Sequence, residues 1–273
     1  MAENFEHASF AGKIAVVTGA AQGIGEAVAR LFAARGVAGL LLTDRTRDKG
    51  EAVAKSIGDA GTPVEFVAAD LGVPAEVETI IPAADKRFGR VDVLVNCAGL
   101  TDRGTVWDTT PELWDRMFAI NVRAPFFLMQ AALRIMVREK GEGAIVNIVS
   151  VNAHRGAAHL TPYSASKGAL STLTKNVAHS VAPYRIKVNG INLGWADTPG
   201  EHTTLKRFHD AGETWLEQAE KGQPWGRLIK PDEVARTVAF LCSAESGLMT
   251  GTVFDFDQAV RGPREQIARM DRP

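Results

Sequence analysis

One stretch near the N-terminus reads Lys13-Ile-Ala-Val-Val-Thr18 and runs directly into Gly19-Ala-Ala-Gln22-Gly23-Ile24-Gly25. Its first half is an apolar run rich in β-branched residues, which is typical of a buried strand. Residues 26–35 then carry apolar side chains at helical spacing, followed by a glycine that can end a helix. A strand, a glycine-rich turn and a helix bind pyrophosphates, because free N–H groups and the positive end of the helix point at the phosphates. The stretch therefore predicts a nucleotide-binding α/β fold.

The rest of the chain repeats this alternation of strands and helices. Apolar runs predict further strands at about 39–43, 64–68, 91–95, 144–150, 186–192 and 252–256. Helical patterns occupy about 45–60, 74–88 and 111–138, and two more helices begin near 162 and 231. This order predicts a single-domain Rossmann-type fold over 1–273, with a doubly wound parallel sheet of about seven strands and helices on both faces. Residues 1–12 are interpreted as an N-terminal extension, and the long strand-free segment 195–226 as a substrate lid.

Composition limits the classes of partner. Of the 273 residues, 45% are hydrophobic and 23% charged, and the net charge of −1 argues against nucleic acid or an anionic membrane surface as a partner. The N-terminus carries no apolar signal segment, and we expect no run that approaches the roughly 20 apolar residues of a membrane span. Cys97 and Cys242 lack a pairing motif, and the six histidines form no metal-ligand spacing. We expect a cytoplasmic protein with no bound metal.

A second informative stretch runs from Ser150 to Lys167 and contains Tyr163-x-x-x-Lys167. Pro162 can occupy the first turn of a helix, which would put Tyr163 and Lys167 on one face. An ammonium near the phenol should lower the tyrosine pKa from about 10 and make it a proton donor and acceptor near neutral pH. Ser150 follows a strand, so its hydroxyl could hold the same substrate oxygen. The competing interpretation of this spacing is a chance pair on a helix surface.

The end of the second strand indicates which dinucleotide binds. Asp44 lies about 20 residues beyond the glycines, where a carboxylate binds ribose hydroxyls and repels a 2′-phosphate. The neutral Gln22 agrees with NAD, whereas Arg45 could pair with the phosphate of NADP. NAD is therefore the predicted cofactor and NADP the alternative. A helix-capping role for Asp44 is compatible with either.

Other residues are singled out by their positions at strand ends. Asp70 and Leu71 could contact the adenine, although a capping aspartate is an equal interpretation. An asparagine such as Asn121 is costly inside an apolar helix unless it is hydrogen-bonded. Polar and aromatic side chains between Ser150 and Tyr163 and in the lid favour a sugar, polyol or hydroxy acid substrate, unless they simply face solvent. The predicted substrate residues are Ser150, Asn152, His154, Trp195 and His202.

Taken together, these motifs resemble the short-chain dehydrogenase/reductase family over about residues 11–256. The resemblance implies that Tyr163 is the general acid/base, that Lys167 binds the nicotinamide ribose and lowers the tyrosine pKa, and that Ser150 positions the substrate oxygen. It also implies a water-holding role for Asn121 in a proton relay, and a contact of Thr198 with the nicotinamide carboxamide. The catalytic residues expected are Asn121, Ser150, Tyr163 and Lys167. The cofactor-binding residues expected are Gly19, Gln22, Gly23, Ile24, Gly25, Asp44, Arg45, Asp70, Leu71, Asn96, Ala98, Gly99, Tyr163, Lys167 and Thr198.

Three positions depart from the family pattern. Cys97 stands where a second asparagine is usual, Leu193 where a proline is usual, and Asp255-Phe-Asp257-Gln258 where Asp-Gly-Gly is frequent. The leucine can loosen the turn before the lid but removes no reacting group, and the change at 255–258 points only to a subunit contact or the edge of the site. The resemblance implies NAD-dependent oxidation of a secondary alcohol, or the reverse reaction, by a homotetramer or homodimer. An NADP-dependent carbonyl or 3-oxoacyl reductase and a non-enzymatic NAD-sensing module are the alternatives.

Overall fold

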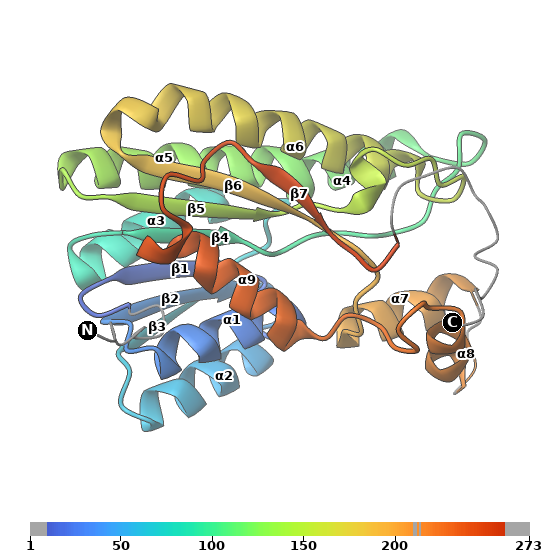
Figure 1. The fold of residues 1–273 in the computed structure, drawn as a ribbon, viewed down its shortest axis with the longest axis horizontal. Coiled ribbons are helices and arrows are strands. Elements are labelled where there is room, and N and C mark those ends of the chain that lie inside the picture. The colour runs from blue at the N-terminus through green and yellow to red at the C-terminus, as the bar shows by residue number, and fades with distance from the viewer. Residues whose placement is uncertain (1–9, 210–211, 213, 260–273) are drawn as a thin grey trace, which may run out of the picture.

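A parallel β-sheet forms the centre of the computed structural model, which describes residues 10–209, 212 and 214–259 (Figure 1). Within these residues seven strands pair in the order β3-β2-β1-β4-β5-β6-β7, and every neighbouring pair is parallel. The strands are β1 (Ile14–Thr18), β2 (Gly39–Asp44), β3 (Val64–Ala68), β4 (Val93–Asn96), β5 (Gly143–Ile148), β6 (Ile186–Leu193) and β7 (Val253–Phe256). The strand order reverses between β1 and β4. A ligand crevice is expected there, at the carboxyl ends of the strands.

Helices cover both faces of the sheet (Figure 1). One face carries α1 (Gly23–Ala34), α2 (Arg47–Asp59) and α9 (Pro231–Cys242). The other carries α3 (Pro74–Phe88), α4 (Pro111–Phe118), α5 (Ala124–Arg138) and α6 (Thr161–Val181). Two further helices, α7 (Pro199–His209) and α8 (Trp215–Lys221), follow β6 and lie beyond the carboxyl ends of the strands. These findings confirm the Rossmann-type arrangement expected from the sequence.

The apolar strand sequences are explained by burial on both faces. In β1, Ala15 and Val17 pack into the core on the α1 side, whereas Val16 between them packs into the core on the α5 side. Leu40 and Leu42 alternate in the same way with Leu41. Because both faces are covered, the strands read as continuous apolar runs without polar alternation.

The expected helix at 111–138 is present and continuous, and it contains a π-helical turn that the sequence analysis did not predict. Between α4 and α5 the chain forms a π-helical segment, Ala119–Arg123, with Asn121 at its middle. Pro125 has no N–H to donate to the carbonyl of Asn121 four residues earlier, and its ring crowds that carbonyl. A single wider turn relieves this conflict, and such π turns often occur at functional sites.

The same helical stretch bears on the membrane expectation. Pro111–Arg138 is long and apolar enough to cross a membrane by length and composition, and half of the apolar window is buried inside the fold. The sequence-based statement that no such run exists was therefore wrong. Packing of α5 against the sheet and α3 accounts for its apolar side chains.

Candidate active site

The turn between β1 and α1 is built from glycines that no other residue could replace without strain. Gly19 and Gly23 have φ values of +68° and +61°. A Cβ on Gly19 would lie 2.9 Å from the Ala98 backbone, and one on Gly25 would lie 2.2 Å from the Gly19 carbonyl oxygen. The N-cap residue Gln22 makes no capping hydrogen bond through its side chain, so the first N–H groups of α1 remain available to a ligand. This cradle fits a pyrophosphate, as predicted.

Asp44 ends β2 next to this turn. Its carboxylate accepts hydrogen bonds from the backbone N–H of Ala21 at 3.3 Å and of Thr46 at 2.9 Å. The side chain therefore ties the glycine turn to the start of α2 and also faces the cavity described below. Arg45 is exposed beside it, and Lys49 donates a hydrogen bond from Nζ to Gln22 Oε1 at 3.2 Å. Lys49 is a second cation in this area that the sequence reasoning missed.

The segments after β3 and β4 line the cavity beside the glycine turn. Asp70 Oδ1 accepts a hydrogen bond from Gly72 N at 2.7 Å, as a turn-capping aspartate does, while Asp70 and Leu71 also line the cavity. After β4, the backbone N–H groups of Cys97 and Ala98 both donate to Thr18 Oγ1 at 3.0 Å. These two hydrogen bonds hold the Ala98–Gly99 backbone beside the glycine turn, and both residues line the cavity.

Two asparagines predicted for the site lie behind the cavity wall instead of on it. Asn96 is buried and donates through Nδ2 to Asn147 Oδ1 at 2.8 Å. Asn121 is fully buried, and its side chain accepts from Leu100 N at 2.8 Å and donates to Leu100 O at 2.9 Å. It also donates to Ser166 Oγ at 3.0 Å. Both residues therefore support the walls, and neither side chain is among those lining the cavity.

Cys97 also faces the cavity, in place of the asparagine that is usual in the family. Burial raises the pKa of its thiol to about 12. The thiolate is the nucleophilic form of cysteine, so the side chain is inert at neutral pH and acts as a small apolar wall residue.

Ser150, Tyr163 and Lys167 meet at the end of β5, as the spacing predicted. α6 begins at Thr161 with Pro162 in its first turn, which places Tyr163 and Lys167 on the face turned to the cavity. Lys167 is buried and donates from Nζ to the Ile148 carbonyl oxygen at 2.8 Å. The same Nζ lies 5.8 Å from the centroid of the Tyr163 ring.

The electrostatics of this cluster differ from the sequence-based expectation. Burial raises the pKa of Tyr163, and the Glu201 carboxylate raises it further, whereas a side-chain hydrogen bond with Ser150 lowers it. Burial also lowers the pKa of Lys167 to about 8. The pKa of Tyr163 is therefore shifted in the direction opposite to the expectation, because burial disfavours the charged form of the phenol.

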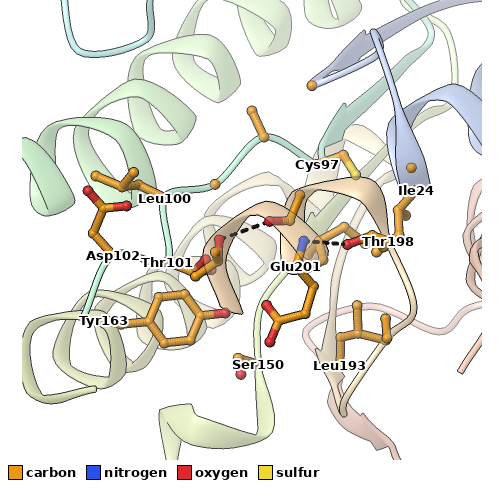
Figure 2. A pocket seen from close by; sticks show the side chains of 18 of the residues that line it. Ile24, Cys97, Leu100, Thr101, Asp102, Ser150, Tyr163, Leu193, Thr198 and Glu201 are labelled. Carbon is orange, nitrogen blue, oxygen red and sulfur yellow. Dashed lines mark hydrogen bonds between the residues drawn. The ribbon is translucent and has the colours of Figure 1, made fainter. Parts of the chain in front are cut away.

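All these elements surround a cavity of about 960 Å³, which extends from the glycine turn to α7. Figure 2 shows Tyr163, Ser150 and Glu201 turned toward a common space, with Leu193 and Thr198 on its other side. The Thr198 hydroxyl accepts a hydrogen bond from Glu201 N at 3.2 Å, and Thr198 lies against Gly23, whose added Cβ would be 3.4 Å away. The glycine turn and the Ser–Tyr–Lys cluster thus open into one space.

The predicted substrate residues divide into two groups. Ser150, Asn152 and Trp195 line the cavity. His154 does not, because its ring faces Asp255 at 3.3 Å and Asn192 at 3.4 Å. His202 does not either, because it contacts the Asp197 carboxylate at 2.7 Å and packs edge-on against Trp215. In both cases the imidazole contacts a carboxylate outside the cavity, that of Asp255 for His154 and that of Asp197 for His202.

The unusual segment after β7 has a structural explanation. Asp257 Oδ2 lies 2.8 Å from Arg155 Nη1, which fixes the loop between Ser150 and Tyr163. Gln258 accepts from Trp225 N at 3.1 Å and donates to Arg227 O at 2.7 Å. The segment therefore connects two loops of the cavity rim, a role that sequence reasoning left unassigned.

This combination of fold and site defines a dinucleotide-binding oxidoreductase of the Rossmann class. A family model described as enoyl-(acyl carrier protein) reductase matches residues 19–259. The chain belongs to the short-chain dehydrogenase/reductase family, as the resemblance implied.

Several relatives are similar over most of their length. Galactitol 2-dehydrogenase of Agrobacterium fabrum is 34% identical over 90% of this chain and 96% of its own. The structure of L-sorbose reductase from Gluconobacter frateurii complexed with NADPH and L-sorbose has a TM-score of 0.86 at 30% identity. The match covers 92% of this chain and 97% of that one. The 3-ketoacyl-(acyl-carrier-protein) reductase of Brucella melitensis complexed with NADH has a TM-score of 0.81 at 34% identity, covering 92% and 98%.

Proposed function

We propose that this protein oxidises a secondary alcohol of a polyol or sugar to a carbonyl, or catalyses the reverse reduction, with NAD as the favoured cofactor. The observation that carries the proposal is the meeting of Ser150, Tyr163 and Lys167 in the same cavity as the glycine turn and Asp44. The polar rim and the similarity to galactitol 2-dehydrogenase and L-sorbose reductase support a polyhydroxylated substrate.

The residues present fit a nicotinamide dinucleotide. The N–H groups of the glycine turn would hold the pyrophosphate, and Asp44 would accept hydrogen bonds from the adenosine ribose. Lys167 and Thr198 would hold the nicotinamide ribose and carboxamide. When bound, the nicotinamide supplies the acceptor or donor for hydride.

The protein's own residues would handle the proton. Ser150 donates a hydrogen bond to the substrate oxygen and fixes it beside the Tyr163 hydroxyl. In oxidation, the Tyr163 phenolate takes the hydroxyl proton; in reduction, the phenol returns it. A protonated Lys167 would oppose the effect of burial and favour the phenolate. The buried Asn121 acts as a positioning residue through its bonds to Leu100 and Ser166.

The cofactor alternative rests on two cations. Arg45 and Lys49 lie next to Asp44 and Gln22, so a 2′-phosphate would meet both positive and negative charge. Structures of the relatives contain NADH in one case and NADPH in the other. Asp44 and Arg45 both line the cavity, whereas Lys49 does not. We favour NAD because the half-buried Asp44 carboxylate is fixed beside the glycine turn by Ala21 N, whereas the Arg45 side chain is exposed.

We further propose that 195–226 acts as a lid on a single dinucleotide-binding domain, and that the protein forms a homodimer or homotetramer through α5 and α6. Phe127 on α5 is 47% exposed, which supports packing of this helix against another subunit. Light scattering after size exclusion measures the mass and tests the oligomer.

The function is tested by following nicotinamide absorbance with a substrate panel. We expect turnover with galactitol or a related polyol and NAD, and none with acyl thioester substrates. Turnover confined to 3-oxoacyl substrates with NADPH would support the reductase alternative. Nucleotide binding without turnover of any alcohol or carbonyl would support the sensing module.

A further inference from the structure

Glu201 places an acidic side chain in the substrate end of the cavity, a feature that the sequence analysis did not single out. It lies in the first turn of α7 and lines the cavity. Its side chain is 18% exposed. Figure 2 shows the carboxylate projecting toward Tyr163 and Ser150.

The carboxylate is held by two cavity residues through one of its oxygens. Trp195 Nε1 donates to Glu201 Oε1 at 3.0 Å, and Arg103 Nη2 lies 3.5 Å from the same oxygen. Across the part of the chain that the structure describes, Oε2 makes no hydrogen bond. One oxygen therefore fixes the orientation of the side chain, and the other is available to a ligand.

The half-buried arginines that line the cavity are already paired. Arg103 donates from Nε to His209 at 3.0 Å and from Nη1 to Thr101 O at 2.6 Å, in addition to its contact with Glu201. Arg155 is paired with Asp257 at 2.8 Å and donates to Ala259 O at 3.2 Å. A substrate carboxylate would have to displace these contacts and would face the Glu201 charge as well.

Building on the proposed function, we propose that Glu201 Oε2 binds a second hydroxyl of the substrate, beyond the one that reacts, and thereby selects neutral polyols. An ionised carboxylate only accepts hydrogen bonds, so its partner must be a donor such as a hydroxyl. A hydroxy acid is rejected by like-charge repulsion, and a simple alcohol has no second hydroxyl to donate to Oε2.

The test compares three substrates in the wild-type protein and in Glu201→Gln. These are galactitol, its aldonate galactonate, and 2-butanol, which has no second hydroxyl. In the variant, kcat/KM for galactitol should fall about 10-fold to 100-fold, because a charged hydrogen bond is replaced by a neutral one. The value for galactonate should rise, and that for 2-butanol should change less than about threefold.

A merely structural role for Glu201, through Trp195 and Arg103, would lower all three values in parallel and would overturn the inference. The matched control is Glu51→Gln on α2, which is exposed, is paired with Arg47 at 3.0 Å and lies outside both the cavity lining and the proposed lid. It should leave all three values unchanged. If Glu201→Gln folds poorly, Glu201→Asp serves as the second variant. It keeps the negative charge and should therefore still discriminate against galactonate.

The two levels of proposal fail in different ways. Wild-type turnover of galactitol with unchanged selectivity in Glu201→Gln would overturn the role of Glu201 and leave the proposed function intact. Absence of wild-type turnover with all three substrates and both cofactors would overturn the proposed function, and this inference with it.

Discussion

Lys167 donates a hydrogen bond from Nζ to the carbonyl oxygen of Ile148, two residues before Ser150 on the same strand end, at 2.8 Å. The buried ammonium thus fixes the segment that carries the serine. A charged amine in this position is costly, because burial disfavours it and one carbonyl offers limited compensation. The pair therefore couples the protonation of Lys167 to the stability of the site.

This coupling predicts a pH-dependent stability difference between the wild type and Lys167→Met. The folded-state pKa of Lys167 is lowered to about 8 from an ordinary 10.5, so the unfolded chain binds more protons between these values. The contribution of Lys167 to stability therefore rises with pH across that window, by up to about 3 kcal/mol. Denaturant unfolding at pH 7 and pH 10.5 measures it. A difference between the two proteins that stays constant with pH would contradict the lowered pKa.

Asp44→Ser tests the cofactor assignment. Removal of the carboxylate should weaken NAD binding about 10-fold and strengthen NADP binding, because Arg45 and Lys49 then meet the 2′-phosphate without the opposing charge. Titration calorimetry with both cofactors gives the two affinities. Asp48→Ser on the exposed start of α2 is the matched control, and equal effects of the two substitutions would count against a direct contact.

Asn121→Ala tests the support behind the site. It leaves the Leu100 N–H and carbonyl buried without partners, so the free energy of unfolding should fall by about 2–4 kcal/mol. Asn176→Ala, at an exposed position on α6, should change it by less than about 0.5 kcal/mol. Chemical denaturation compares them. Equal stability of the two variants would show that the π turn is held by other contacts.

Gly19→Ala and Gly36→Ala separate backbone strain from steric contact. Both glycines have positive φ, +68° and +76°, but an added Cβ meets Ala98 at 2.9 Å in the first case and nothing within 4 Å in the second. Gly36→Ala should cost about 1–2 kcal/mol of stability and leave NAD binding unchanged. Gly19→Ala should cost more and also weaken NAD binding. Unfolding curves and calorimetry distinguish the two, and identical results would refute the close packing of the turn.

The fold was predictable because the five inner strands are buried on both faces and have apolar sequences, and because Gly19 to Gly25 mark the first turn. The π-helical turn at 119–123 was missed, although Pro125 four residues after Asn121 was a readable signal. Placement of His154 and His202 failed for another reason. Sequence gives their proximity to Tyr163 and to the lid, but their partners Asp255 and Asp197 become visible only with the chain folded.

The sequence predicted which residues meet in the site, but it did not predict how burial shifts their pKa values. Tyr163, Lys167 and Ser150 meet as their spacing indicated. The pKa of Tyr163 is raised instead of lowered, because burial, which the spacing does not report, is the largest effect on it. Glu201 was overlooked because its role depends on the Trp195 and Arg103 contacts that orient it.

The central claim is that Tyr163 exchanges the proton with the substrate. The most direct measurement is the turnover of Tyr163→Phe with galactitol and NAD, together with its NAD affinity. We predict that kcat falls about 1,000-fold while the dissociation constant for NAD stays within about twofold of the wild-type value. A variant that binds NAD normally and retains kcat within about threefold of the wild type would contradict the account.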